Sequence, residues 1–240
     1  MNSTTIAIGV FLFSIPFYII SFHSLKKYLE EDQTGQTKSQ KKHIFYAFLT
    51  WSVGFTSAVI GAAMVSPAME QATLITVVIM HKLFDAFNII GCFFFFMFLT
   101  DFMENLKKHT LFFKAVLIIT LILIFVTPSG VIITEDGHIP WRSGIASAAI
   151  LFSWIISLAI ISHQFWKHSK LMEKKVSIRR SQMISIGAFF MISAYIFVIL
   201  AQVLTQGIML VFGQISAIAS GIVFYAAFAI PGWLRRIWEK

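Results

Sequence analysis

The sequence predicts an all-α, integral membrane bundle of seven helices, and three observations lead to that fold class. Of the 240 residues, 58% are hydrophobic and only 12% are charged, whereas a soluble domain carries roughly 25% charged residues. Seven apolar stretches are each long enough to cross a bilayer, which takes about 20 helical residues. The segments between them alternate sharply in charge. We therefore expect a single transmembrane domain over residues 1–240.

The expected helices follow the apolar stretches. They cover residues 6–25, 43–66, 71–100, 110–133, 143–166, 181–204 and 207–230, with a short interfacial helix at 233–240. The polar, charged stretch 24–42 is expected to be a flexible connection between the first two helices. In the last segment Trp233 and Trp238 share one face and Arg235 and Arg236 lie on the other, a pattern typical of a helix lying in the membrane interface. Tryptophans that suit the interface also occur at Trp141 and Trp166.

The distribution of positive charge predicts the orientation. The connections after the first, third, fifth and seventh helices carry nearly all basic residues: Lys26, Lys27, Lys38, Lys41, Lys42, Lys107, Lys108, Lys167, Lys170, Lys174, Lys175, Arg179, Arg180, Arg235, Arg236 and Lys240. The opposite side offers only Arg142. By the positive-inside rule the N-terminus is outside and the C-terminus is cytoplasmic. We expect the plasma membrane of a prokaryote.

A polar stripe in the third helix is the main candidate site. His81, Asp85, Asn88 and Cys92 share one helical face, and Lys82 lies three residues from Asp85. One charged residue at the bilayer centre costs roughly 2.5–3.5 kcal/mol. The stripe must therefore face other protein or water.

Two interpretations of this stripe remain open. Lys82 and Asp85 can form a structural ion pair that fixes the third helix in the bundle. Alternatively, the stripe opens outward as a pocket for a small-molecule ligand or a proton, with Gln202 and Gln214 lining the same outer half. A histidine beside a carboxyl group has a tunable pKa near neutral pH, so His81 would suit a proton-linked switch.

Small residues recur at every fourth position in two helices. They are Gly54, Ala58 and Ala62 in the second helix and Gly213, Ala217 and Gly221 in the seventh. Such seams allow another backbone to approach closely, either within the bundle or in a dimer. The outer loop 134–142 contains an Asp136-Gly137 turn and is either a lid over a pocket or an ordinary turn.

Several function classes lack support in the sequence. No nucleophile elbow, paired-carboxylate site or cluster of metal ligands is evident, so we expect no enzyme activity, no metal and no cofactor. Haem ligation by two histidines would need two at matching depth, and only His81 is well inside a helix. A retinal protein would need a lysine between Gly207 and Ile230, where none occurs. The net charge of +8 reflects topology, so we expect no nucleic-acid binding.

The end of the last helix resembles a known module. The run from Phe224 to Trp238, with Tyr225, Phe228, Pro231 and Trp233-Leu234-Arg235, is similar to the end of the seven-helix N-terminal sensor module of prokaryotic membrane histidine kinases. Residues 178–187, with two arginines and a glycine, are similar to the start of that module's sixth helix. The kinase's dimerisation helix and ATP-binding lobe have no counterpart in these residues. The resemblance implies a sensor that signals through a partner or through helix movement.

Taken together, these features predict a non-enzymatic, receptor-like membrane sensor. Its expected partners are membrane lipids, a small-molecule ligand and a partner kinase. The alternative is a non-catalytic subunit of a larger membrane complex, which would pack through the small-residue seams and need no pocket.

Overall fold

The computed structural model describes residues 3–30, 36–65, 71–134 and 137–239. Its helices are α1 (Ser3–Glu30), α2 (Gln36–Met64), α3 (Gln71–Phe102), α4 (Glu104–Lys107), α5 (Thr110–Val126), α6 (Gly144–Ser169), α7 (Lys175–Leu204), α8 (Gly207–Phe228) and α9 (Gly232–Glu239). Two short strands, β1 (Ser129–Thr134) and β2 (Gly137–Arg142), form a hairpin between α5 and α6. Apart from this hairpin the fold is all-α, as predicted.

Within the described residues, five helices are long and apolar enough to cross a membrane. They are α2, α3, α6, α7 and α8. The apolar helix α5 is shorter, with 17 residues. The architecture is therefore that of a helical bundle of an integral membrane protein.

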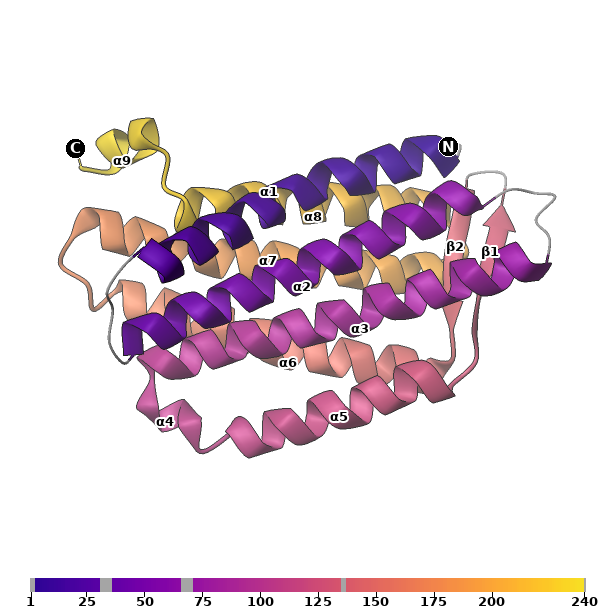
Figure 1. The fold of residues 1–240 in the computed structure, drawn as a ribbon, viewed down its shortest axis with the longest axis horizontal. Helices are drawn as coiled ribbons and strands as arrows, with labels where there is room; N and C mark the ends of the chain where they lie inside the picture. Colours follow the sequence, from indigo (N-terminus) through magenta and orange to yellow (C-terminus); the bar gives the residue numbers. More distant parts are fainter. Residues whose placement is uncertain (1–2, 31–35, 66–70, 135–136, 240) are drawn as a thin grey trace.

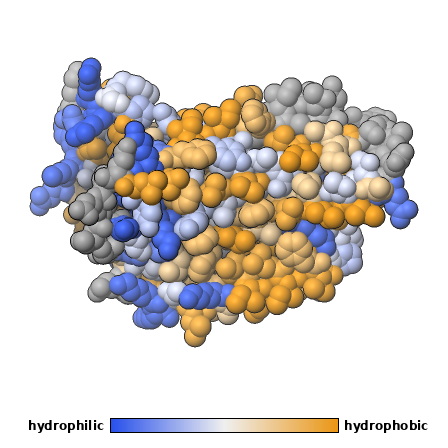
Figure 2. All heavy atoms as spheres, in the orientation of Figure 1, coloured by the Kyte–Doolittle hydropathy of each residue, from blue (hydrophilic) through white to orange (hydrophobic). Residues whose placement is uncertain are grey.

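The long helices lie side by side (Figure 1), and their contacts close them into a ring. Consecutive long helices are neighbours, and α8 completes the ring by packing against α1. We call the end that holds β1 and β2 the hairpin end, and the end that holds α4, α9 and the connection 170–174 the basic end. The N-terminus lies at the hairpin end and the C-terminus at the basic end (Figure 1). On the face shown in Figure 2, hydrophobic residues cover the middle and hydrophilic residues gather at the basic end.

Aromatic rings fill the core between α1, α2, α3 and α8. The ring of Phe48 lies 5.2–5.9 Å, centroid to centroid, from the rings of Phe17, Trp51, Phe95, Phe224 and Phe228. Each such pair contributes about 0.5–1.5 kcal/mol beyond the area it buries. This cluster fixes the side of α3 that faces the bundle.

The small-residue seams lie inside the bundle. A Cβ atom on Gly54 would lie 3.2 Å from the Phe84 carbonyl oxygen of α3, and one on Gly213 would lie 3.1 Å from the Ala194 carbonyl oxygen of α7. Each glycine thus permits two backbones of the same chain to approach closely.

The helix predicted over 110–133 was too long. It ends at Val126, and Thr127, which precedes Pro128, is extended with φ −80° and ψ 151°. The residue before a proline avoids the helical region because of steric clash. The β-branched run Val131–Ile133 then forms part of β1, whose register pairs Ser129 with Arg142 and Thr134 with Gly137.

The polar stretch 24–42 is more helical than predicted. α1 continues to Glu30 and α2 begins at Gln36. α7 likewise begins at Lys175, before the predicted residue 181. Hydropathy marks only the apolar part of a helix. Because charged residues can also be helical, a prediction from hydropathy alone ended α1 too early and began α2 and α7 too late.

The hairpin lies across its end of the bundle. β1 packs against α3, and β2 packs against α1, α7 and α8 (Figure 1). The side chain of Ile139 on β2 is fully buried. The hairpin therefore closes this end of the ring and brings Arg142, its last residue, into the bundle.

Candidate functional site

The polar stripe of α3 faces the interior. His81, Asp85, Asn88 and Cys92 are all buried, with at most 8% of each residue exposed. Their spacing places them on the face that packs against α2 and α6. The charge of Asp85 is therefore kept away from lipid.

Asp85 forms a bidentate ion pair with Arg142. The Arg142 Nε atom donates to Oδ2 at 2.5 Å and Nη2 donates to Oδ1 at 2.8 Å. Both side chains are only 4% exposed. Bidentate arginine–carboxylate pairs are among the strongest polar contacts in proteins. This pair links the middle of α3 to the hairpin and to α6, which starts two residues after Arg142.

α7 supplies two further contacts to the pair. The Tyr195 hydroxyl donates to Asp85 Oδ1 at 3.4 Å, and the Tyr195 ring stacks on Trp154 of α6 with centroids 4.8 Å apart. The Gln202 amide donates to the Arg142 carbonyl oxygen at 3.1 Å and to Ser147 Oγ at 3.3 Å. We call the set Asp85, Arg142, Tyr195 and Gln202 the latch. It joins α3, the hairpin and α7, and through Ser147 it reaches α6.

Three polar atoms around the latch are buried without a hydrogen-bond partner in the described part of the chain. They are Arg142 Nη1, Trp154 Nε1 and Gln202 Oε1. An unpaired buried polar group costs about 1–3 kcal/mol. Two donors and one acceptor beside the ion pair thus lack a partner among the described residues.

Lys82 does not pair with Asp85. Its ammonium group donates to the carbonyl oxygens of Phe125 and Thr127 at 2.9 and 3.0 Å. These carbonyls lie at the end of α5, where the last carbonyl groups of a helix have no backbone N–H partner within the helix. A cation is also favoured there by the helix dipole. Lys82 therefore fixes the end of α5 against α3.

The other predicted site residues have separate environments. His81 Nδ1 donates to the Val77 carbonyl oxygen at 2.8 Å, and Asn88 Nδ2 donates to the Phe84 carbonyl oxygen at 2.7 Å. Both contacts lie within α3. Gln214 is half-buried on α8 and is not bonded to Asp85 or Arg142. Of the six predicted residues, only Asp85 and Gln202 belong to the latch.

The predicted interface residues lie on the surface. Trp141, Trp166 and Trp233 are 41%, 44% and 65% exposed, and Trp238 is half-buried. Arg235 and Arg236 are exposed on α9, where Arg235 donates to Glu239 Oε1 at 2.8 Å.

Sequence reasoning missed Arg142 as the partner of Asp85. One signal was available, because Arg142 is the lone basic residue on the side that is otherwise free of positive charge. By the positive-inside rule a basic residue is unusual on that side of the membrane. A carboxylate partner inside the bundle was therefore to be expected for Arg142. Nothing comparable in the sequence indicated that Tyr195 or Trp154 would lie at this site.

The comparisons with known proteins add no family to this geometry. No family model matches the chain, and no curated protein matches it. The chemistry of the latch therefore carries the functional argument.

Proposed function

We propose that the chain is a non-enzymatic, receptor-like membrane sensor in which the latch is the switch. The buried Asp85–Arg142 pair carries this proposal, because it joins the hairpin to the centre of the bundle. A stimulus that separates the two charges would free the hairpin and the start of α6 together.

The proposed topology has seven crossings with the hairpin end outside. Besides the five long apolar helices, α1 has 28 residues and α5 has 17. The length of α5 is at the lower limit of the roughly 17–25 residues that span a bilayer. The basic end carries the lysines and arginines of α9 and of the connection 170–174, which favours a cytoplasmic location. The exposed tryptophans then suit the two interfaces.

The stimulus would be a small polar ligand or a proton that competes for the latch. The unpartnered atoms of Arg142, Trp154 and Gln202 give a ligand two donors and one acceptor beside an ion pair. A proton on the Asp85 carboxyl group would remove one of the two charges. In both cases Arg142 loses the interaction that holds it in the bundle.

α6 and α7 connect the latch at the hairpin end to the basic end, so a movement at the latch would be transmitted along them. α6 has 26 residues, and a helix of that length spans about 39 Å. Ser143, next to Arg142, caps α6 by accepting a hydrogen bond from the Ala146 amide at 3.2 Å. Displacing Arg142 would therefore displace the start of α6 directly. The output would be a change in helix arrangement that a partner kinase reads, in line with the resemblance at residues 224–238.

The alternative of an accessory subunit has less support. It relied on Gly54 and Gly213 as contact seams, and both are used between helices of this chain. Native mass spectrometry in mild detergent distinguishes the two proposals, because a stable hetero-complex would favour the subunit.

Distance measurements between spin labels at the basic end test the sensor proposal. In a Cys92→Ala background, labels at Lys108→Cys and Lys170→Cys report the position of the end of α6 relative to the chain after α3. The protein is held in nanodiscs between about pH 5 and 8, where histidine and perturbed carboxyl groups titrate. Asp85→Asn and Arg142→Gln should each shift the distance distribution by about 2 Å or more, the scale of helix shifts in switching proteins.

The matched control is Thr120→Val. It removes a buried hydroxyl pair between α5 and α6, in which Thr120 Oγ1 and Ser153 Oγ lie 2.7 Å apart, without touching the latch. This variant should keep the wild-type distribution. If both latch variants fold and keep the wild-type distribution at every pH, the sensor proposal is wrong.

A further inference from the structure

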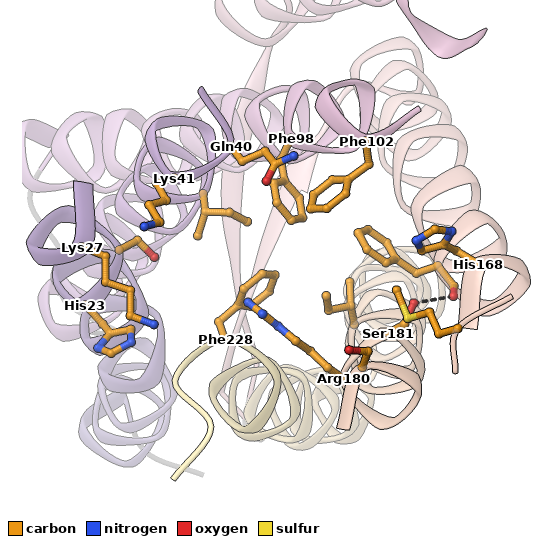
Figure 3. A pocket seen from close by; sticks show the side chains of 16 residues that line it. His23, Lys27, Gln40, Lys41, Phe98, Phe102, His168, Arg180, Ser181 and Phe228 are labelled. Carbon is orange, nitrogen blue, oxygen red and sulfur yellow. Dashed lines mark hydrogen bonds between the residues drawn. The ribbon is translucent and has the colours of Figure 1, made fainter. Parts of the chain in front are cut away.

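A cavity at the basic end lies apart from the latch. It encloses about 350 Å³ between α1, α2, α3, α6, α7 and α8. That volume is within the roughly 300–1,000 Å³ of small-molecule sites. Figure 3 shows side chains from these helices pointing into one central space. The cavity therefore belongs to the folded bundle rather than to a single loop.

Basic groups from four helices face this cavity. They are His23 and Lys27 of α1, Lys41 of α2, His168 of α6 and Arg180 of α7 (Figure 3). No carboxylate is among the described residues that line it. Like charges around one cavity repel one another, so an anion in their midst is favoured.

Two of these basic groups are positioned for a ligand. The Arg180 guanidinium lies 5.9 Å from the centre of the Phe228 ring and makes no ion pair in the described part of the chain. The Nε2 atom of His23 is buried and has no hydrogen-bond partner among the described residues. Arginine and histidine are suited to binding a phosphate group, the former through a bidentate contact.

The floor of the cavity is aromatic. The ring of Phe98 lies 5.9 Å from those of Phe165 and Phe228, and Phe102 lies 6.2 Å from Phe165. Ile44, Met172 and Ile184 complete the apolar lining. A ligand with a phosphate at one end and a hydrocarbon body at the other would match this arrangement.

A second cavity adjoins the first toward α9. It encloses about 620 Å³ and shares Lys27, Arg180 and Phe228 with it. Its remaining charged lining consists of Lys174, Lys175 and the exposed Arg235–Glu239 pair. The two cavities thus form a cationic passage that reaches the amphipathic helix α9, which suits the membrane interface.

We infer that this passage binds a phosphate-bearing amphiphile, with the phosphate between Lys27 and Arg180 and the apolar body on Phe98 and Phe228. The inference does not depend on the latch. The phosphate can come from an anionic phospholipid of the adjacent leaflet or from a soluble phosphate compound, and the two sources are separable by experiment.

Binding is measured on the full chain in two arms. In the first, native mass spectrometry counts the phosphatidylglycerol and phosphatidylcholine molecules retained after delipidation. In the second, the thermal midpoint in phosphatidylcholine nanodiscs is followed as inorganic phosphate is added. Selective retention of phosphatidylglycerol identifies the lipid source, and a midpoint that rises with phosphate in the wild type but less in Arg180→Gln identifies the soluble source, because phosphate also stabilises folded proteins in general.

Arg180→Gln and Lys27→Gln are the test variants, and Arg179→Gln is the matched control. Arg179 precedes Arg180 on α7 but lines a different surface groove. Each test variant should weaken binding at least about tenfold, as expected for loss of one charge-assisted hydrogen bond, and Arg179→Gln should not. The Lys27 variant keeps the test valid if Arg180→Gln fails to fold. Equal loss in the control, or no binding in either arm, overturns the inference.

Discussion

At the scale of single residues, the buried Arg142 and the half-buried Lys82 have different tasks. Arg142 neutralises Asp85 across a long stretch of sequence, and Lys82 caps the carbonyl end of α5. Sequence spacing allowed a Lys82–Asp85 pair, because the two residues are close on one helix. In the structure Asp85 pairs with Arg142 instead, because the hairpin places the Arg142 side chain next to it. The planar guanidinium of Arg142 can bind both carboxylate oxygens.

Removing one member of the ion pair should destabilise the protein strongly. Arg142→Met leaves the Asp85 carboxylate buried and unpaired, and a broken buried pair costs about 3–5 kcal/mol. The double variant Asp85→Leu with Arg142→Met should recover most of that loss, because apolar replacement of a whole buried pair is often neutral. Reversible unfolding in mixed detergent micelles measures both. A loss below about 1 kcal/mol in the single variant would contradict a buried, unscreened pair.

Lys82→Met should loosen the end of α5. The substitution keeps the length of the side chain but removes the two hydrogen bonds to Phe125 and Thr127. We expect a loss of about 0.5–2 kcal/mol and faster amide exchange in the last turn of α5. Lys114→Met, on the exposed face of the same helix, is the control and should change neither quantity. Unaltered exchange in the Lys82 variant would show that the cap is unimportant.

At the scale of helices and strands, packing explains where sequence reasoning succeeded and where it failed. Long apolar runs such as 71–102 identify a helix because a lipid-spanning segment must satisfy its own backbone. The run Val131–Ile133 is as apolar, yet it forms a strand after Pro128. The hairpin, and with it the pairing of Asp85 to Arg142, could not be predicted because it depends on contacts between residues 57 positions apart.

Close helix contacts make Gly91 of α3 a sensitive position. A Cβ atom there would lie 2.4 Å from Cδ1 and Nε1 of the Trp51 indole, which is fully buried and donates to the Asn88 carbonyl oxygen at 3.1 Å. Gly91→Ala should therefore cost about 1–3 kcal/mol, as for other overpacked cores. In contrast, Gly144→Ala meets nothing within 4 Å at the start of α6 and should be neutral or slightly stabilising. Thermal midpoints of the two variants in one detergent give the comparison, and equal midpoints would refute the predicted clash.

At the scale of the whole molecule, the two ends of the bundle differ in chemistry. The hairpin end is closed by β1 and β2 and contains the latch, whereas the basic end is open to a cationic passage with an aromatic floor. Charge patterning in the sequence predicted this polarity. It could not predict the cavity, because the lining residues come from six helices and meet only in the folded bundle.

The sensor proposal assigns the hairpin end to the outside and the basic end to the cytoplasm, and cysteine labelling in intact cells tests that assignment directly. In a Cys92→Ala background, single cysteines replace Ser3 and Gln206 near the hairpin end and Lys170 and Arg236 at the basic end. A membrane-impermeant maleimide should label Ser3→Cys and Gln206→Cys in intact cells, and Lys170→Cys and Arg236→Cys only after permeabilisation. Labelling of Lys170→Cys or Arg236→Cys in intact cells, or protection of Ser3→Cys and Gln206→Cys, would contradict the account.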